Sequence, residues 1–263
     1  MAVPIRKQET NKIITFSIVD GKISKKPEVK YNKDGSVDKR CTNKNKVAGV
    51  SSEVYPLTTQ EEIKDIIDVF DRHINEASDE NKKQIAYRNK MMFLIGINIS
   101  LRASDLITLK WNFFLKDNGE FKESYTIMPK KTKKHKKFVT LYFNQAVKKA
   151  IADYIEKYPV KDMNEYLFKS RKGDKCITEI SLGRIIKDAA TEAGIEKNIC
   201  SHTLRKTFGF WAWHNAEDKN KALVTLQMLF NHSDTSTTLR YIGILGSEIE
   251  DMFNSVDLGL DYI

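Results

Sequence analysis

The sequence predicts an α+β fold: a mostly helical domain with a small antiparallel β-sheet over residues 57–263, preceded by a short basic N-terminal arm over residues 1–56. Apolar residues recur at the spacing of an amphipathic helix through most of the larger region. Two short stretches of alternating apolar and polar residues flank a lysine-rich turn, which is the pattern of a β-hairpin. With 263 residues, 41% of them hydrophobic, the chain is large enough to bury a core of its own.

The arm carries most of the net charge of +9. Residues 1–50 hold 12 Lys and Arg against 5 Asp and Glu, a net charge of +7, whereas the rest of the chain holds 32 against 30. Asp20 and Gly21, between two strand-like stretches, predict a hairpin turn, and a disordered tail fits the same polar composition. Basic segments favour polyanionic partners such as nucleic acids.

The body begins near Leu57 with two overlapping helix-start signals. Thr58 with Glu61, and Thr59 with Glu62, each fit a capping box, in which two side chains bond reciprocally to the backbone at the start of a helix. The apolar residues that follow recur at helical spacing: Ile63, Ile66, Ile67, Phe70 and Ile74.

Further helices are predicted by the same spacing over residues 84–99, 103–110, 144–157 and 180–193. Residues 113–121 and 123–143 are predicted to form short strands, the last two of which flank the lysine-rich turn. Gly194 is placed to end the helix before it, because glycine commonly follows the last residue of a helix.

The stretch from Ser201 to Tyr241 combines two histidines, an arginine and a tyrosine. His202 and Arg205 are three residues apart and so share one face of a helix, which Ser201 is placed to cap. An arginine grips a phosphate through two parallel hydrogen bonds. The hydroxyl of a tyrosine has a pKa of about 10 and is a poor nucleophile until positive neighbours stabilise its anion. Together with His232, these groups suggest attack on a phosphodiester.

A helix over residues 221–230 is predicted to separate the two halves of this set. In the helix before it, Phe208, Trp211 and Ala212 are expected to face inward. Asn231 follows the later helix, and Asn is the non-glycine residue that most readily adopts the left-handed conformation ending many helices. We therefore expect a left-handed turn at this position.

Arg102 adds a second arginine upstream, at the junction of two predicted helices. An arginine at such a junction can present its guanidinium at the mouth of a site while its stem packs below. Asp105, three residues later, could hold an arginine or a histidine in place. Ser104 and Asp105 could also cap the following helix, and the two roles are compatible.

In their order and spacing these residues resemble the catalytic domain of the tyrosine recombinase, or phage integrase, family over about residues 57–244. Four motifs carry the resemblance: Arg102–Leu106, His202–Arg205, Leu229–Ser233 and Tyr241. The third motif departs from the family pattern, which favours Gly where this chain has Asn231. A left-handed Asn makes that substitution compatible with a working site.

The resemblance implies a site-specific recombinase or integrase that cuts and rejoins DNA through a 3′-phosphotyrosine. Arg102 and Arg205 would hold the phosphate, Tyr241 would attack it, and the 5′-hydroxyl would leave. His202 would accept the tyrosine proton, and His232 would bond the phosphate. No metal and no cofactor are expected, because cationic side chains serve the phosphate and the phosphotyrosine conserves the bond energy.

Six of the eight residues from Lys130 to Lys137 are lysines. Most of them suit a solvated loop that contacts DNA phosphates without sequence preference. The family places a catalytic lysine in a hairpin here, commonly followed by Thr, and Lys131 before Thr132 matches best. Lys131 would protonate the leaving oxygen, and Asp105 would hold the catalytic residues in place without contacting the phosphate itself. The alternatives to Lys131 are Lys133, Lys134 and Lys136, and the expected DNA-binding lysines are Lys130, Lys133, Lys134, Lys136 and Lys137.

The implied partners are double-stranded DNA and further copies of the chain, assembled as a tetramer at paired sites. Relatives usually carry a helical DNA-binding domain ahead of the catalytic domain, and the first fifty residues show no helical periodicity that could build one. Apolar residues in the tail predict a helix over about residues 247–257: Ile249, Met252, Phe253 and Val256. This helix would either pack on the protein's own core or dock on a neighbouring protomer, as terminal helices do in relatives.

Other functions fit parts of the sequence. A type IB topoisomerase shares the mechanism but relaxes DNA without a partner site, and an inactive DNA-binding regulator would bind DNA without a covalent adduct. A zinc site is disfavoured, because no His-x₃₋₅-His or Cys-x₂-Cys spacing occurs. Three scattered cysteines do not suggest a disulfide framework, and without a signal peptide or a membrane-spanning run we expect a cytoplasmic protein.

Overall fold

The computed structural model describes residues 53–130, 138–171, 173–244, 253, 255 and 256, together with the backbone of two strands in the N-terminal arm. Residues 1–53 and 54–263 form two separate units. In the first unit, β1 (Phe16–Val19) pairs antiparallel with β2 (Lys22–Lys25). Lys131, Lys133, Lys134, Lys136, Lys137 and most of the predicted tail helix lie outside the described residues.

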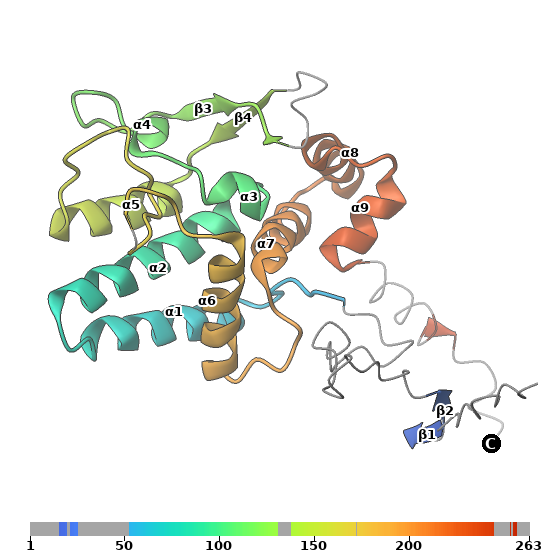
Figure 1. Ribbon diagram of the computed structural model, residues 1–263. Helices are drawn as coiled ribbons and strands as arrows, with labels where there is room; N and C mark the ends of the chain where they lie inside the picture. The colour runs from blue at the N-terminus through green and yellow to red at the C-terminus, as the bar shows by residue number, and fades with distance from the viewer. Residues whose placement is uncertain are drawn as a thin grey trace, which may run out of the picture. The chain divides into compact units, whose positions relative to one another are not determined.

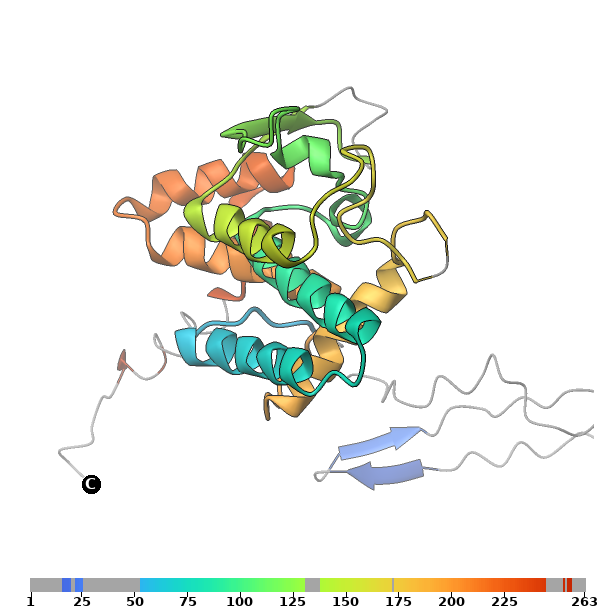
Figure 2. The same ribbon diagram turned by 90° about the vertical axis from the view of Figure 1, so that its left-hand side faces the viewer.

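The second unit is mainly helical, as predicted, and its longest helix, α2 (Glu80–Asn98), lies at its centre (Figure 1). It packs against α1 (Gln60–Asn75), α5 (Gln145–Lys157) and α7 (Ser201–His214). Figure 2 shows it running between α1 and α5. No helix in the described part of the chain is long and apolar enough to cross a membrane. A further helix, α6 (Glu179–Glu192), lies beside α1 and α7.

Local hydrogen bonds fix where the first two helices start. The capping box of α1 forms between Thr59 and Glu62, and Thr58 instead donates its backbone N–H to the same glutamate at 2.8 Å. The predicted start of α2 at residue 84 is late, because Asp79 caps the helix by accepting a hydrogen bond from the Lys82 N–H at 2.8 Å. A side-chain acceptor at this position satisfies an N–H that has no partner within the helix.

The close approach of α2 to α7 depends on a glycine. A Cβ at Gly96 would lie 2.6 Å from the Cδ1 of Leu204, so a larger residue would push the two helices apart. The end of α2 leads directly to Arg102, and Leu204 precedes Arg205 in α7. Gly96 therefore lets the core bring the two arginines to the same place.

The predicted helix over residues 103–110 is wrong in length. Only α3 (Ala103–Leu106) forms within it, Lys110 pairs with Tyr166 as an isolated bridge, and a separate helix, α4 (Trp111–Phe114), follows. The predicted strand over residues 113–121 is wrong as well, apart from a single bridge between Leu115 and Phe121. A helical turn buries both Trp111 and Phe114, which a strand would place on opposite faces.

A two-stranded sheet is present beside α4, as predicted. The strands β3 (Ser124–Ile127) and β4 (Val139–Tyr142) pair antiparallel, with Ile127 opposite Val139. A hydrogen bond of 2.9 Å joins the hydroxyls of Thr126 and Thr140 across the pair. The end of β3 and the start of β4 lie on the side of this sheet nearest α8 in Figure 1.

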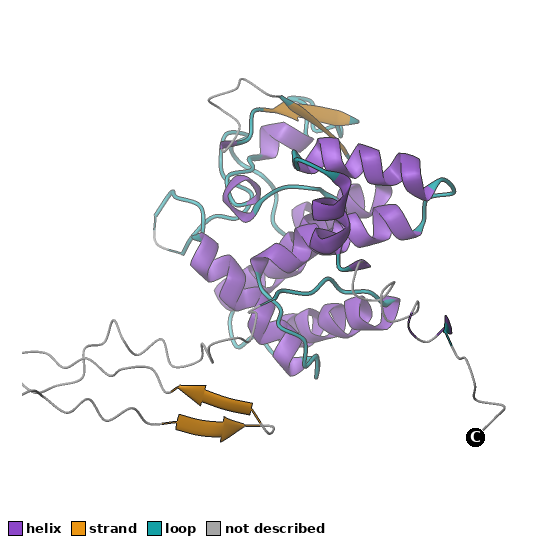
Figure 3. Cartoon of the chain, turned by 90° about the vertical axis from the view of Figure 1, so that its right-hand side faces the viewer, coloured by secondary structure: helices purple, strands orange, loops and turns teal. Residues whose placement is uncertain are grey.

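A second apolar cluster joins α7 to α8 (Lys219–Phe230) and α9 (Thr235–Ile242), the group seen from its outer side in Figure 3. Gly209 in α7 makes this contact possible, because a Cβ there would lie 2.6 Å from Ile242 and 2.9 Å from Phe230. The predicted inward residues of α7, Phe208, Trp211 and Ala212, are only half-buried. Because α7 is covered on one side by α2 and on the other by α8 and α9, its most buried residues are Thr203, Leu204, Arg205, Lys206, Thr207 and Gly209.

The chain ahead of α1 packs against α7. Leu57 is fully buried; its N–H donates to the Thr207 hydroxyl at 2.9 Å, and its carbonyl accepts from the Trp211 indole at 3.0 Å. These bonds satisfy the backbone of an extended segment that has no strand partner. The predicted start of the body near Leu57 coincides with this anchoring point.

Candidate active site

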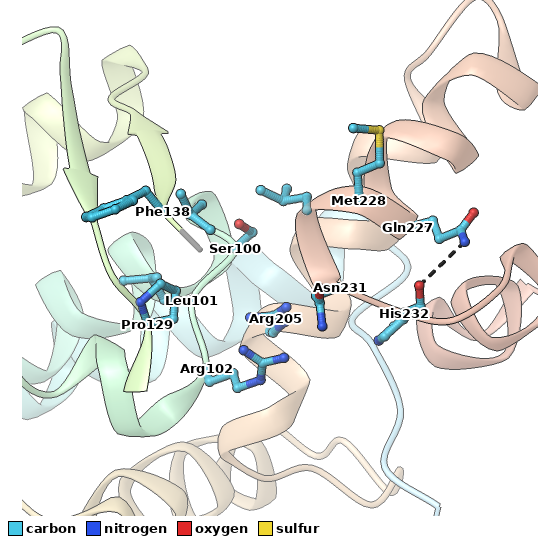
Figure 4. A pocket seen from close by; sticks show the side chains of 12 residues that line it. Ser100, Leu101, Arg102, Pro129, Phe138, Arg205, Gln227, Met228, Asn231 and His232 are labelled. Carbon is cyan, nitrogen blue, oxygen red and sulfur yellow. Dashed lines mark hydrogen bonds between the residues drawn. The ribbon is translucent and has the colours of Figure 1, made fainter. Parts of the chain in front are cut away.

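A cavity of about 480 Å³ opens between the segment ahead of α3, the β3–β4 hairpin, α7 and the α8–α9 turn. Figure 4 shows the guanidiniums of Arg102 and Arg205 side by side at its base. Phe138 and Met228 stand on opposite sides of its mouth and are 62% and 77% exposed. The cavity thus combines a cationic base with exposed apolar edges.

The two arginines converge on one backbone carbonyl. Arg102 donates to the carbonyl of Phe230 at 3.2 Å, and Arg205 donates to the same oxygen at 3.4 Å. The Arg205 guanidinium also lies 4.5 Å from the centre of the Phe230 ring. The last residue of α8 therefore fixes Arg205 through both its carbonyl and its side chain.

Holding these like charges together is costly unless an anion joins them. Burial, with a smaller contribution from the charge of Arg102, lowers the pKa of Arg205 to about 10, while Tyr241 and Asp105 act in the opposite direction. Arg205 is only 5% exposed. Two adjacent guanidiniums offer enough donors for the non-bridging oxygens of one phosphate. The base of the cavity is therefore suited to an oxyanion.

Asn231 ends α8 in the left-handed conformation, at φ 56° and ψ 50°, which confirms the sequence prediction. Its N–H bonds back to the carbonyls of Gln227 and Met228. This reversal leaves the Phe230 carbonyl directed at the arginines and brings His232 to the edge of the cavity.

The imidazole of His232 is held from behind by a buried hydroxyl. Its Nδ1 lies 3.1 Å from Oγ1 of Thr238, which is fully buried and donates to the Asp234 carbonyl at 3.3 Å. Oγ1 accepts from Nδ1–H in one tautomer of the ring and donates to Nδ1 in the other, which leaves a proton on Nε2. Burial, then the charges of Arg205 and Arg102, lower the pKa of His232, which favours the neutral ring.

The ring of Tyr241 packs between aromatic neighbours beside the cavity. Its centre lies 5.1 Å from that of His232 and 5.3 Å from that of Phe230, both in edge-to-face geometry. Burial raises the pKa of Tyr241, and the charges of Arg205 and Arg102 partly oppose this. The hydroxyl is thus protonated at neutral pH and must lose its proton to act as a nucleophile.

Asp105 is a buried residue of α3 and holds Lys130, the first residue of the lysine-rich segment. Its Oδ1 accepts from the backbone N–H of Lys130 at 3.0 Å, and its Oδ2 has no hydrogen-bond partner among the described residues. The Lys130 ammonium donates to the Ser104 carbonyl at 2.8 Å. The predicted capping of α3 by Ser104 or Asp105 is wrong, because that helix has no side-chain cap. Asp105 acts on Arg205 through its charge.

His202 differs from the other predicted catalytic residues that the structure describes in being exposed. It lies in the first turn of α7, and neither it nor Tyr241 lines the cavity among the described residues. Ser201 was expected to cap this helix, but the cap is Cys200, whose sulfur accepts from the His202 N–H at 3.4 Å. The helix therefore starts one residue earlier than a Ser201 cap implies, and His202 lies in its exposed first turn.

Sequence reasoning missed two groups that organise the site: the Phe230 carbonyl and Thr238. A main-chain carbonyl carries no residue-type signal, and its role follows only from the left-handed turn after it. Thr238 lies six residues after His232, and only the fold of the α8–α9 turn brings the two together.

Residues 57–245 match the family model described as the phage integrase family. The probable integrase/recombinase YoeC of Bacillus subtilis is 38% identical over 174 residues, which cover 64% of this chain and 86% of YoeC. The tyrosine recombinase XerD of Oceanobacillus iheyensis is 28% identical over 178 residues, 65% of this chain and 55% of XerD. For XerC of Staphylococcus epidermidis the identity is 27% over 176 residues, 66% and 54% of the two chains. The chain thus spans about half the length of these Xer proteins.

Solved structures show the same fold. The crystal structure of the XerA recombinase matches with a TM-score of 0.54 at 18% identity, covering 80% of this chain and 66% of that one. The XerH site-specific recombinase, solved bound to its difH substrate before cleavage, matches with a TM-score of 0.51 at 20% identity, covering 79% and 56%. With the family model covering most of the chain and YoeC matched over most of its length, the protein belongs to the phage integrase family of tyrosine recombinases.

Proposed function

We propose that the protein is a site-specific DNA recombinase that cuts and rejoins double-stranded DNA through a 3′-phosphotyrosine on Tyr241. The observation that carries this proposal is the convergence of Arg102 and Arg205 on one point beside the Tyr241 ring. A bound phosphate would replace the Phe230 carbonyl as the common acceptor of both guanidiniums. The XerH relative was solved on its DNA substrate, which supports DNA as the partner.

In the proposed reaction, the oxygen of Tyr241 attacks the phosphorus, a P–O bond to tyrosine forms, and the bond to the 5′-oxygen breaks. Arg102 and Arg205 donate to the non-bridging oxygens, where negative charge grows in the transition state. Rejoining reverses these steps with a 5′-hydroxyl as the nucleophile. Because the phosphotyrosine conserves the energy of the broken bond, no nucleotide cofactor is consumed.

The proton transfers are proposed from the family resemblance. His202 accepts the proton of Tyr241, and Lys131 gives a proton to the leaving 5′-oxygen. His232 bonds the phosphate, for which its neutral ring must present a proton on the nitrogen facing the cavity. Asp105 holds the first residue of the lysine-rich segment and so supports Lys131 from behind. The expected DNA contacts of that segment come from Lys130, Lys133, Lys134, Lys136 and Lys137.

Covalent trapping on a pool of nicked duplexes of random sequence tests this function and locates the DNA site. When a strand is broken close to a nick, the short fragment that carries the new 5′-hydroxyl diffuses away, so the adduct accumulates and its DNA can be sequenced. We expect adducts enriched in one sequence and recombinant junctions only when two copies of that sequence are present. Relaxation of plasmids that lack the sequence would favour a topoisomerase, and binding without any adduct would favour an inactive regulator.

Replacing Thr238 with Val is expected to slow cleavage about tenfold, the effect of losing one hydrogen bond that orients a reacting group. The substitution keeps the shape of the side chain but removes the hydroxyl that holds Nδ1 of His232. Single-turnover cleavage of the selected duplex measures the change, and Thr238→Ser should restore the rate.

Thr225→Val is the matched control for this substitution. Thr225 makes the same kind of bond, to the carbonyl four residues earlier at 2.8 Å, but lies exposed on α8 and has no histidine partner. Equal losses in the two variants would show that Thr238 acts only through helix stability.

We also propose that residues 1–56 form a basic arm that contacts DNA, and that residues 247–257 form a helix exchanged between protomers of a tetramer. Among the described residues of the tail, Phe253 and Val256 are 77% and 61% exposed. Apolar side chains exposed in this way are suited to a partner surface.

Removing residues 247–263 is expected to leave the melting temperature unchanged and to weaken assembly on paired DNA sites. The exchanged helix contributes to contacts between protomers rather than to the protein's own core. Thermal melting and native gels of the truncated protein measure the two effects. A large drop in melting temperature would show that the tail packs on its own domain.

A further inference from the structure

Lys206 follows Arg205 in α7 and is buried, with 8% of its surface exposed. Its ammonium lies 5.3 Å from the centre of the Tyr241 ring. Lysines are rarely buried, because removing an ammonium from water is costly. The contact with the Tyr241 ring offsets part of the free-energy cost of burying this ammonium.

The ring of Tyr241 is contacted by three side chains of different character. Phe230 and His232 meet it in edge-to-face geometry, and Lys206 lies over it as a cation. A cation over an aromatic ring is attracted by the negative charge of the ring face, and the attraction strengthens when the site is dry. These contacts fix the ring while its hydroxyl points toward the arginines that act on it.

Bound DNA would affect the charge of Lys206 less than the charges of the two arginines near this ring. The charged and titratable groups that face Tyr241 come from α7, its cap, the segment ahead of α3 and the α8–α9 turn: Arg205, Lys206, Cys200, Arg102 and His232. A bound phosphate would neutralise much of the charge of Arg102 and Arg205. The charge of Lys206 lies over the ring rather than at the base of the cavity, so it remains available to the tyrosine.

We propose that Lys206 is a positioning residue for Tyr241, whose ammonium orients the ring and stabilises the phenolate that attacks DNA. This inference rests on the proposed function, in which Tyr241 is the nucleophile. A phenolate ring carries more negative charge than a phenol ring, so the cation favours the deprotonated form. The contact therefore stabilises the reactive form of tyrosine more than its resting form, which is the condition for accelerating a reaction.

The phenol can be titrated without DNA by placing 3,5-difluorotyrosine at position 241 of the full chain and following its ¹⁹F signal. This analogue is more acidic than tyrosine and titrates where the protein is folded. Lys206→Met, which keeps the length of the side chain but removes the charge, is expected to raise the pKa at position 241 by about one unit. Lys206→Arg should keep the pKa within a few tenths of the value in the unsubstituted protein.

Lys110→Met provides the matched control. Lys110 lies 5.2 Å from the centre of the Tyr166 ring, a similar contact away from the site. We expect this variant to leave the pKa at position 241 unchanged. If Lys206→Met does not fold, Lys206→Gln makes the same test with a polar side chain.

Cleavage of the selected duplex adds a second readout with natural tyrosine at position 241. The rise of the single-turnover rate with pH should move to higher pH in Lys206→Met and be restored in Lys206→Arg. An unchanged pKa and an unchanged pH profile in a folded Lys206→Met protein would overturn the role of Lys206. A shifted pKa at position 241 in a protein that forms no DNA adduct would leave the electrostatic contact standing and refute the proposed function instead.

Discussion

Replacing Tyr241 with Phe is expected to abolish the covalent DNA adduct entirely while leaving DNA affinity and melting temperature unchanged. Only the hydroxyl is lost, and phenylalanine retains the ring contacts with Phe230 and His232 and the position under Lys206. The oxygen that would attack the phosphorus is therefore removed while the ring stays in place. Denaturing gels of the trapped complex measure the adduct, and filter binding measures the affinity.

Tyr142→Phe is the control for this change. Tyr142 is 76% exposed on β4, so removal of its hydroxyl should leave both adduct and binding as they are. A residual adduct in Tyr241→Phe of more than a trace would contradict the assignment of the nucleophile.

Replacing Arg205 with Met is expected to lower the cleavage rate by about 10²–10³, the typical cost of losing one group that stabilises transition-state charge. The melting temperature of the protein should not fall by an amount that explains the lost cleavage. Burial holds the pKa of Arg205 at about 10, below its ordinary value of 12.5, so the folded state disfavours the charge that the substitution removes. The Phe230 carbonyl also keeps its bond of 3.2 Å from Arg102.

The control for Arg205 is a second buried arginine outside the site. Arg88 is 8% exposed and also has a pKa lowered to about 10 by burial, but it bonds to Asn89 and the Lys169 carbonyl. Arg88→Met should leave single-turnover cleavage by the folded protein unchanged. A loss of melting temperature in Arg205→Met that accounts for its lost activity would show that Arg205 acts only through the fold.

The fold class followed from short-range patterns that the structure retains. Helical spacing identified α1, α5 and α6, and the sequence around the lysine-rich turn identified the β3–β4 hairpin. Asn231 was placed in the left-handed conformation on residue type alone. These features depend on a few neighbouring residues, which is why the sequence suffices to predict them.

The errors come from contacts between distant residues. The helix predicted over residues 103–110 ends at Leu106, and its predicted last residue, Lys110, instead pairs with Tyr166, more than fifty residues later. Phe208, Trp211 and Ala212 are half-buried because α7 is covered from two sides, which a single amphipathic stripe does not describe. Neither contact leaves a signal in the local sequence.

The candidate site was predictable in its residue types but not in its supports. Arg102, Arg205 and His232 line one cavity with Tyr241 beside it, whereas His202 is exposed and Lys131 lies outside the described residues. The groups that hold the arginines, the histidine and the tyrosine are the Phe230 carbonyl, Thr238 and Lys206. They come from three different segments, and only the packing of α7 against α8 and α9 brings them together.

The identity of the residue that carries the DNA tests the central claim most directly. After nuclease digestion of the trapped adduct, mass spectrometry of the peptides should find the remaining nucleotide on Tyr241, joined through its 3′-phosphate, and the released strand should end in a free 5′-hydroxyl. A nucleotide on another tyrosine, such as Tyr125 or Tyr262, or a linkage through a 5′-phosphate, would contradict the proposed chemistry.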